Sequence, residues 1–198
     1  MHLMKKNKFF VIIIFVLTQF FLFTNSFGET LKIGNKNAKI TVKVFSSLTC
    51  PHCASFHQEV FEKLKKIYID KNEVKFEHHA FPLDLAALNA EKIVRCAAGP
   101  EAKFKLLEKI YETQKKWAVG SDIKKINESL IKIGIDSQIQ RDKLEKCLNN
   151  SISQDAILNE RIEAQKKFNI TSTPTIYIND KKYEDKHEFK SFKKQIDK

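Results

Sequence analysis

The sequence predicts an α/β domain whose sheet is interrupted by a long helical stretch. Residues 40–45 alternate in polarity and are β-branched, which predicts a strand, and 74–79 predict a second one. Between them, apolar residues of 51–71 recur at helical spacing. β-branched residues return only at 175–178, after about 80 residues of helical pattern. The strand–helix–strand unit favours parallel strands joined by a right-handed crossover.

The N-terminal residues predict a secretory signal peptide over 1–28. It begins with three lysines: Lys5, Lys6 and Lys8. An almost wholly apolar run follows at 9–23, and Ser26 and Gly28 supply the small residues of a possible cleavage site after Gly28. The run is shorter than the roughly 20 residues of a membrane span, and an uncleaved anchor is the alternative. No cysteine lies near the cleavage site, which argues against a lipoprotein.

The remaining residues, 29–198, have the length of a single domain with a substantial core. The whole chain carries a formal charge of +11. Its lysines alternate with acidic residues, as in 59–66 and 103–116, which is typical of solvated helix faces. We therefore expect no nucleic-acid partner, although a basic surface favours anionic membranes or acidic partners.

Helical spacing defines most of the other elements. In 51–71 the apolar positions lie opposite a charged face: Phe56, Val60, Leu64 and Ile67. Five more helices are predicted, at 84–98, 100–117, 121–133, 137–148 and 153–168. Gly99 and Gly134 predict helix ends, and Pro100 suits the first position of the next helix.

The C-terminal part predicts a hairpin and a helix. Strand 175–178 leads through an Asn179–Asp180 turn to a possible partner strand at 182–184. A short helix at 188–196 closes the chain.

The cysteines are Cys50, Cys53, Cys96 and Cys147. The first two belong to a Cys-Pro-His-Cys motif, and the last two lie far apart in predicted helices. We expect Cys50 at the N-cap of the helix that begins with Pro51. Helix N-termini carry partial positive charge and unpaired N–H groups, which stabilise a thiolate and lower the pKa of the thiol. His52 can add a positive charge or a donor, and the spacing brings Cys53 within disulfide reach.

Two other interpretations of the motif are weaker. A zinc site needs a second ligand pair at matching distance, and His78 and His79 are adjacent on a strand and therefore point to opposite faces. A purely structural bond between Cys50 and Cys53 would close a very small loop and stabilise little. The pattern therefore favours a redox-active pair.

Four segments together resemble one known family. Ser47-Leu-Thr-Cys-Pro-His-Cys53, placed after a strand, resembles the active-site segment of the DsbA-type branch of the thioredoxin fold. The segment 33–38 precedes it, and the segments 76–83 and 168–179 come after it, in the same order as in the family. The resemblance covers the chain from about Leu31 to the end. It implies a thioredoxin fold with a large helical subdomain inserted at about 84–168.

The resemblance also assigns roles to individual residues. It implies that Cys50 and Cys53 are catalytic and that Pro51, His52, Thr173 and Pro174 support the active site. Thr173–Pro174 is then expected to be a cis peptide bond that faces the site, where Thr173 can pair with an extended substrate. Cys96 and Cys147 are implied to form a structural disulfide, with two free buried thiols as the alternative.

One position departs from the family. Its members often place a buried acid six positions before the first active-site cysteine, where this chain has Val44. The neighbouring Lys43 should face the other side of the strand. In the family this acid assists proton transfer from the second cysteine. Here Cys53 either has no such group or uses another one, and the candidates are His52, Glu77 and His78.

The function that the resemblance implies is that of a bacterial periplasmic dithiol oxidase, which introduces disulfides into exported proteins. A disulfide isomerase or reductase on the same fold is one alternative, and a non-catalytic binding protein that keeps the pair as a relic is another. The implied partners are unfolded or reduced exported proteins and a membrane-bound, quinone-linked reoxidase. No metal, nucleotide or flavin motif is present, so we expect no cofactor. We expect a monomer, because only about a dozen residues precede the first core strand.

Overall fold

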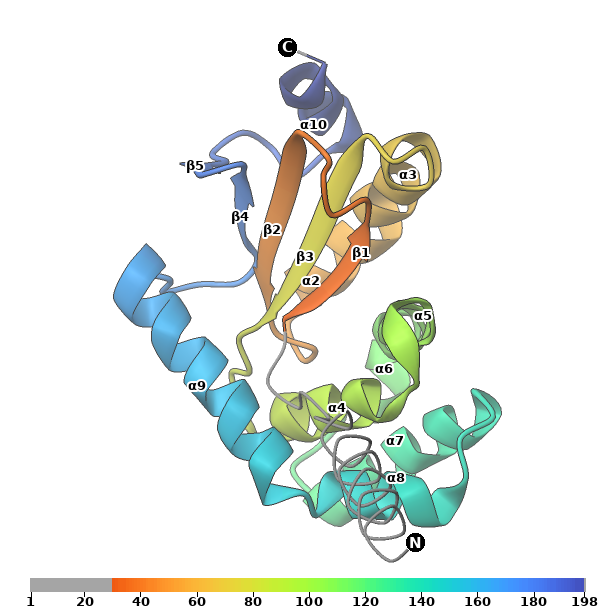
Figure 1. Ribbon diagram of the computed structural model, residues 1–198. Helices are drawn as coiled ribbons and strands as arrows, with labels where there is room; N and C mark the ends of the chain where they lie inside the picture. The colour runs from red at the N-terminus through yellow and green to blue at the C-terminus, as the bar shows by residue number, and fades with distance from the viewer. Residues whose placement is uncertain (1–29, 198) are drawn as a thin grey trace, which may run out of the picture.

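The computed structural model describes residues 30–197, and the predicted signal peptide lies outside them. Its centre is a five-stranded mixed sheet (Figure 1). The strands are β1 (Leu31–Gly34), β2 (Ile40–Ser46), β3 (Val74–Ala80), β4 (Thr175–Ile178) and β5 (Lys181–Lys182), in the order β1-β3-β2-β4-β5. β2 and β3 are parallel and the other pairs are antiparallel. In this register Val44 lies opposite His78, and the predicted parallel unit is confirmed.

Strand β1 was not predicted. Its four residues, Leu31–Gly34, are too few to show a clear alternation, yet Leu31 and Ile33 are buried while Lys32 is exposed. The strand is held by antiparallel pairing with β3, a contact with residues about 45 positions further along the chain.

The helix between β2 and β3 differs from the regular one that was predicted. It consists of α2 (Pro51–Phe56), η2 (His57–Phe61), α3 (Glu62–Leu64) and η3 (Lys65–Ile69). The η segments are π-helical, and the N–H of Asp70 accordingly donates to the carbonyl of Lys65 at 2.9 Å. Because the wider turns rotate the later positions, Tyr68 and Ile69 are buried while the predicted core residue Ile67 is only half-buried.

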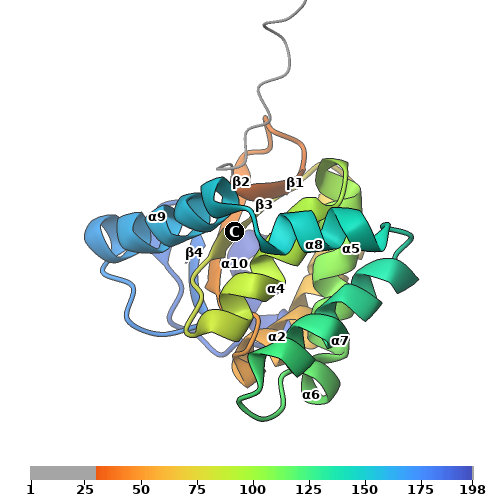
Figure 2. The same cartoon turned by 90° about the horizontal axis from the view of Figure 1, so that it is seen from below.

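The insertion between β3 and β4 is helical, as predicted. It contains α4 (Leu85–Cys96), α5 (Gly99–Glu112), α6 (Gln114–Trp117), α7 (Ile123–Asp136), α8 (Arg141–Leu148) and α9 (Ser151–Phe168). α4 contacts α5, α7, α8 and α9 (Figure 2). The helix predicted over 100–117 is broken at Thr113, whose φ and ψ of −98° and 8° are not helical.

Gly134 does not end a helix, contrary to the prediction. α7 continues through it to Asp136, and α8 starts at Arg141 rather than at 137. A Cβ atom on Gly134 would lie 2.6 Å from Cδ2 of Leu144. The glycine therefore allows α7 and α8 to approach each other closely.

The two faces of the sheet are covered by different helices (Figure 1). On one face, Val44 and Phe76 belong to the main core, together with residues of α2, α4 and α5. On the other face, Phe45 packs with Ala164 of α9 and Ile170. A last helix, α10 (Phe189–Ile196), reaches the main core through Phe192.

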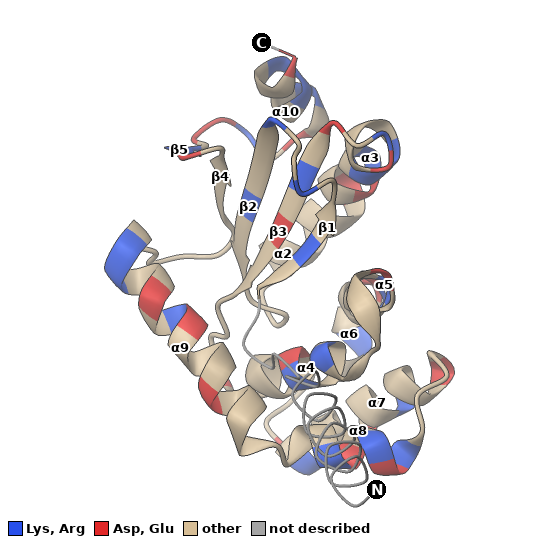
Figure 3. Ribbon diagram, in the orientation of Figure 1, with Lys and Arg blue, Asp and Glu red and all other residues tan. Residues whose placement is uncertain are grey.

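Charged residues are spread over the inserted helices and the strands of the sheet, with both signs interspersed (Figure 3). This agrees with the alternation of lysines and acidic residues in the sequence. In residues 30–197 no helix is both long and apolar enough to span a membrane.

Candidate active site

Cys50 lies at the N-cap of α2, directly after the loop that follows β2. Its backbone is extended, with φ and ψ of −78° and 119°, and Pro51 occupies the first helical position. The carbonyl of Cys50 accepts hydrogen bonds from the N–H groups of Cys53 and Ala54, at 3.1 and 3.2 Å. Pro51 and His52 are exposed.

The surroundings of Cys50 favour its thiolate. They lower the pKa of the thiol from 9.0 to about 5, chiefly because the Cys53 thiol donates a hydrogen bond to the sulfur. Burial works in the opposite direction, while Thr173 and the backbone groups of Cys53 and His52 lower the pKa further. His52 therefore acts on the sulfur through its backbone amide at the helix N-terminus.

Cys53 has the opposite character. Its side chain is fully buried, and burial raises its pKa well above 9.0, with a further increase from the hydrogen bond and charge of Cys50. Both cysteines are free thiols in this structure. At neutral pH the pair therefore holds one thiolate, on Cys50, and one thiol, on Cys53.

The segment that leads into β4 faces the same sulfur. The Thr173–Pro174 bond is cis, as the resemblance implied. The carbonyl oxygen of Thr173 lies 3.3 Å from Sγ of Cys50, whose thiol form donates to it. The structure thus brings together six predicted site residues: Cys50, Pro51, His52, Cys53, Thr173 and Pro174.

Gln114 of α6 holds the active-site loop, and no sequence pattern predicted this role. Its side-chain amide donates to the carbonyl of Leu48 at 2.8 Å and to the carbonyl of Cys50 at 3.0 Å. Gln114 is buried, so both bonds are shielded from water. A residue of the helical insertion therefore fixes the loop that carries the reactive sulfur.

Three other unpredicted side chains surround the motif. The phenol of Tyr111 lies 3.5 Å from the carbonyl of Ser47, and the ring of His57 stacks on Tyr111 at 4.5 Å. His187, in the loop before α10, packs against Phe56. Burial lowers the pKa of His187, and the charge of His52 lowers it further. No local pattern marks these residues, because they reach the site from separate helices and loops.

The structure places the candidate proton-transfer groups on different faces of the sheet. Val44 is fully buried on the face of α2, and His78 is its neighbour there. Glu77 belongs to the other face, where His79 first, and Lys75 in addition, lower its pKa to about 2. Lys43 also lies away from the α2 face and pairs with Asp180 at 3.0 Å.

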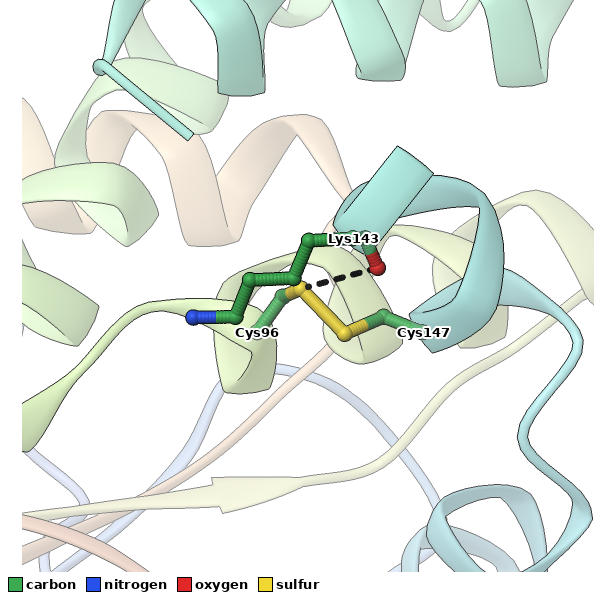
Figure 4. Close-up of a disulfide and its surroundings, with 3 residues drawn as sticks. All are labelled: Cys96, Lys143 and Cys147. Atoms are coloured by element: carbon green, nitrogen blue, oxygen red, sulfur yellow. Dashed lines mark hydrogen bonds between the residues drawn. A yellow bond between two sulfur atoms is a disulfide. The ribbon is translucent and has the colours of Figure 1, made fainter. Parts of the chain in front are cut away.

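Cys96 and Cys147 form a disulfide between α4 and α8 (Figure 4). Their Cα atoms are 5.9 Å apart, and the carbonyl oxygen of Lys143 contacts the sulfur of Cys96 at 3.5 Å. Residues 30–197 contain no cluster of three or more His, Cys, Asp or Glu side chains that could hold a metal ion.

A helix-capping thiolate, a buried second thiol and a neighbouring cis-proline segment on this sheet match the arrangement expected for the DsbA-type branch of the thioredoxin fold. The family model described as thioredoxin matches residues 26–198. The chain belongs to the thioredoxin family, and the predicted fold is confirmed.

Relatives and solved structures agree with this assignment. Disulfide bond formation protein D of Bacillus subtilis is 30% identical over 84% of this chain and 75% of its own length. A putative protein-disulfide oxidoreductase of Rickettsia conorii is 34% identical over 74% of this chain, and another from Rickettsia typhi is 31% identical over 77%. The chain spans only 52% and 55% of these two relatives. The crystal structure of Wolbachia pipientis alpha-DsbA1 matches with a TM-score of 0.78 and 28% identity, covering 85% of this chain and 89% of that one.

Proposed function

We propose that this protein is a dithiol oxidase, which uses the Cys50–Cys53 disulfide to oxidise pairs of thiols in other proteins. The observation that carries the proposal is the lowered pKa of Cys50, about 5. A stable thiolate favours the reduced form of the pair, so the disulfide form readily takes up electrons.

The reaction has two exchange steps. A substrate thiolate attacks Sγ of Cys50, the Cys50–Cys53 bond breaks, and Cys53 leaves with the electron pair and is protonated, because its pKa is raised. A second substrate thiolate then attacks the substrate sulfur of the mixed disulfide. Cys50 leaves as a thiolate, and its low pKa makes it a good leaving group. The substrate is oxidised to a disulfide, and the pair is reduced to a thiolate on Cys50 and a thiol on Cys53.

The other predicted site residues have supporting roles in this proposal. Pro51 begins the helix, and the amide of His52 stabilises the thiolate. The carbonyl edge of Thr173, before Pro174, lies beside the reactive sulfur and is suited to pair with an extended substrate backbone. Cys96 and Cys147 act as a structural bond that holds α4 to α8.

The cellular setting is also a proposal. We infer that residues 1–28 direct export, and that residues 29–198 act in the periplasm as one monomeric domain. The substrates would be unfolded or reduced exported proteins, and a membrane-bound, quinone-linked enzyme would restore the disulfide. Fractionation of cells, followed by N-terminal sequencing of the exported form, tests the export. Recovery of unprocessed protein from the cytoplasm would contradict it.

The reduction potential of the Cys50–Cys53 pair tests the direction of electron flow. Equilibration with glutathione buffers, followed by alkylation and mass measurement, should give a value well above that of thioredoxin, about −270 mV. The Cys96→Ala/Cys147→Ala variant serves as the control, because Cys50 and Cys53 are then the only cysteines whose oxidation state can change. A potential close to that of thioredoxin would overturn the oxidase and favour the reductase alternative.

A further inference from the structure

A cluster of buried polar side chains lies on the face of the sheet that carries Cys53. It comes from four separate elements and consists of His57, His78, Glu91 and Tyr111, whose exposed fractions are 2%, 0%, 0% and 1%. The mechanism described above uses none of them. Groups of this kind are costly to bury, so a protein keeps them where they serve a purpose.

The centre of the cluster is the pair formed by His78 of β3 and Glu91 of α4. Nε2 of His78 lies 2.7 Å from Oε1 of Glu91. The remaining two polar atoms of the pair, Nδ1 of His78 and Oε2 of Glu91, have no hydrogen-bond partner among the described residues. The pair therefore has unused capacity to take up and share a proton.

The position of the pair connects it with Cys53. His78 lies opposite Val44 in the β2–β3 register, on the face that packs against α2. The charges of both Cys53 and Glu91 act on Tyr111 and contribute to its raised pKa, after the larger effect of burial. In this water-poor region a charge acts over distances at which water would screen it.

We propose that the His78–Glu91 pair accepts the proton that Cys53 loses when the active-site disulfide closes. The inference rests on the proposed redox role of Cys50 and Cys53. In the closing step, the Cys53 sulfur attacks Sγ of Cys50 in a mixed disulfide, and the partner sulfur leaves with the electron pair. The proton of Cys53 passes to the pair, which has two unpartnered polar atoms that can receive it.

The other groups around Cys53 are poorer acceptors. Burial lowers the pKa of His57 far below its usual range, and the charge of His78 lowers it further. Tyr111 keeps its proton, because burial raises its pKa. The other charged side chains of α4 contact α9, Lys92 through Gln154 at 3.5 Å and Arg95 through Glu160.

A two-phase reaction with 5,5′-dithiobis(2-nitrobenzoate) tests the proposal on the full-length reduced protein. Attack by Cys50 releases the first chromophore, and attack by Cys53 on the mixed disulfide releases the second. In Glu91→Gln, which keeps the shape of the side chain, we expect an unchanged first phase. The second phase should slow by about tenfold or more at neutral pH, because a positioned proton acceptor is lost.

The pH profile of the second phase separates proton transfer from a structural effect. In the wild type the rate should reach a plateau, because the pair accepts the proton, whereas in Glu91→Gln it should keep rising with hydroxide. Glu91→Asp retains a carboxylate and should recover the plateau. Two results for Glu91→Gln would overturn the proposal. One is a second phase that is slowed by the same factor at every pH, and the other is a second phase as fast as that of the wild type.

The sheet supplies a matched control. His79 follows His78 on β3 but points to the opposite face, where Nδ1 lies 3.4 Å from Glu160. Glu160→Gln should therefore leave the second phase and its pH profile unchanged. Loss of the first phase in the wild type would contradict the proposed function instead, because that phase depends on Cys50 alone.

If Glu91→Gln fails to fold, nuclear magnetic resonance of the wild-type protein answers the same question. The chemical shifts of the His78 ring should differ between the reduced and oxidised forms at neutral pH. Identical His78 chemical shifts in the two forms would overturn the proposal.

Discussion

The two cysteines of one motif have pKa values that are shifted in opposite directions, because hydrogen bonds dominate at Cys50 and burial dominates at Cys53. Cys50 receives hydrogen bonds from Cys53 and from backbone amides, which hold its pKa at about 5. Cys53, three residues further along the chain, is surrounded by the core, and its burial raises its pKa well above 9.0. This difference supports the proposal that Cys50 meets the substrate and Cys53 resolves the mixed disulfide.

The acidity of Cys50 gives a direct prediction. The rate of alkylation of the reduced protein by iodoacetamide should be half-maximal at a pH of about 5, and Cys50→Ser should remove this reaction. Folding lowers this pKa, so the thiolate stabilises the reduced fold fully above pH 9, and this contribution is lost as the pH falls through about 5. Half-maximal alkylation near pH 9 would contradict the assignment of the thiolate.

At the scale of the elements, the sequence patterns predicted most strands and helices well. Strand β2, the helix that begins at Pro51 and the C-terminal hairpin have local signals, namely alternation, apolar spacing and turn residues. β1 was missed because it depends on pairing with β3. The π-helical turns of η2 and η3 were missed because 3.6-residue spacing assumes a regular helix.

The candidate site also contains residues that local sequence patterns predict and residues that they do not. The Cys-Pro-His-Cys motif and the Thr173–Pro174 segment are marked by their own residues, so the sequence led to them. Gln114 and Glu91 have no such mark, because ordinary glutamines and glutamates occupy similar helical positions throughout the chain. Glu91 meets His78 because α4 packs against the sheet. Gln114 meets the carbonyl of Leu48 because α6 packs against the active-site loop.

The close approach of α7 and α8 predicts the effect of Gly134→Ala. Alanine favours a helix over glycine by about 1 kcal/mol, so an unhindered site would be stabilised. Here the added Cβ would lie 2.6 Å from Leu144, and we expect a loss of about 1–3 kcal/mol in the free energy of unfolding. Urea denaturation measures it.

The control is the same substitution in a Leu144→Ala background. Removal of the leucine side chain removes the obstacle, so Gly134→Ala should then stabilise the protein. An equal loss in both backgrounds would show that contact with Leu144 is not the cause.

At the scale of the whole molecule, the helical insertion between β3 and β4 is held together by a disulfide of its own. The disulfide between Cys96 and Cys147 spans 51 positions of the chain and joins α4 to α8. Because it restricts a long loop in the unfolded chain, its removal in Cys96→Ala/Cys147→Ala should lower the free energy of unfolding by on the order of 4 kcal/mol. Chemical denaturation of the variant and the wild type measures the difference.

The same variant should keep the reactivity of Cys50, because α6 rather than α8 supplies the bonds of Gln114. Its alkylation profile serves as the control. Unchanged stability would mean that the bond does not constrain the insertion, and a raised pKa of Cys50 would mean that the bond reaches the active site.

The hydrogen-bond partners of Cys50 are made at different times during synthesis of the chain. The ribosome makes Cys50 and Cys53 early, but Gln114 follows Cys50 by 64 positions and the carbonyl of Thr173 follows it by 123. A nascent chain that ends before these residues carries both thiols. It lacks the hydrogen bonds of Gln114 to the active-site loop and the carbonyl of Thr173 beside Cys50. The contacts that surround Cys50 are therefore complete only when nearly all of the chain has been made.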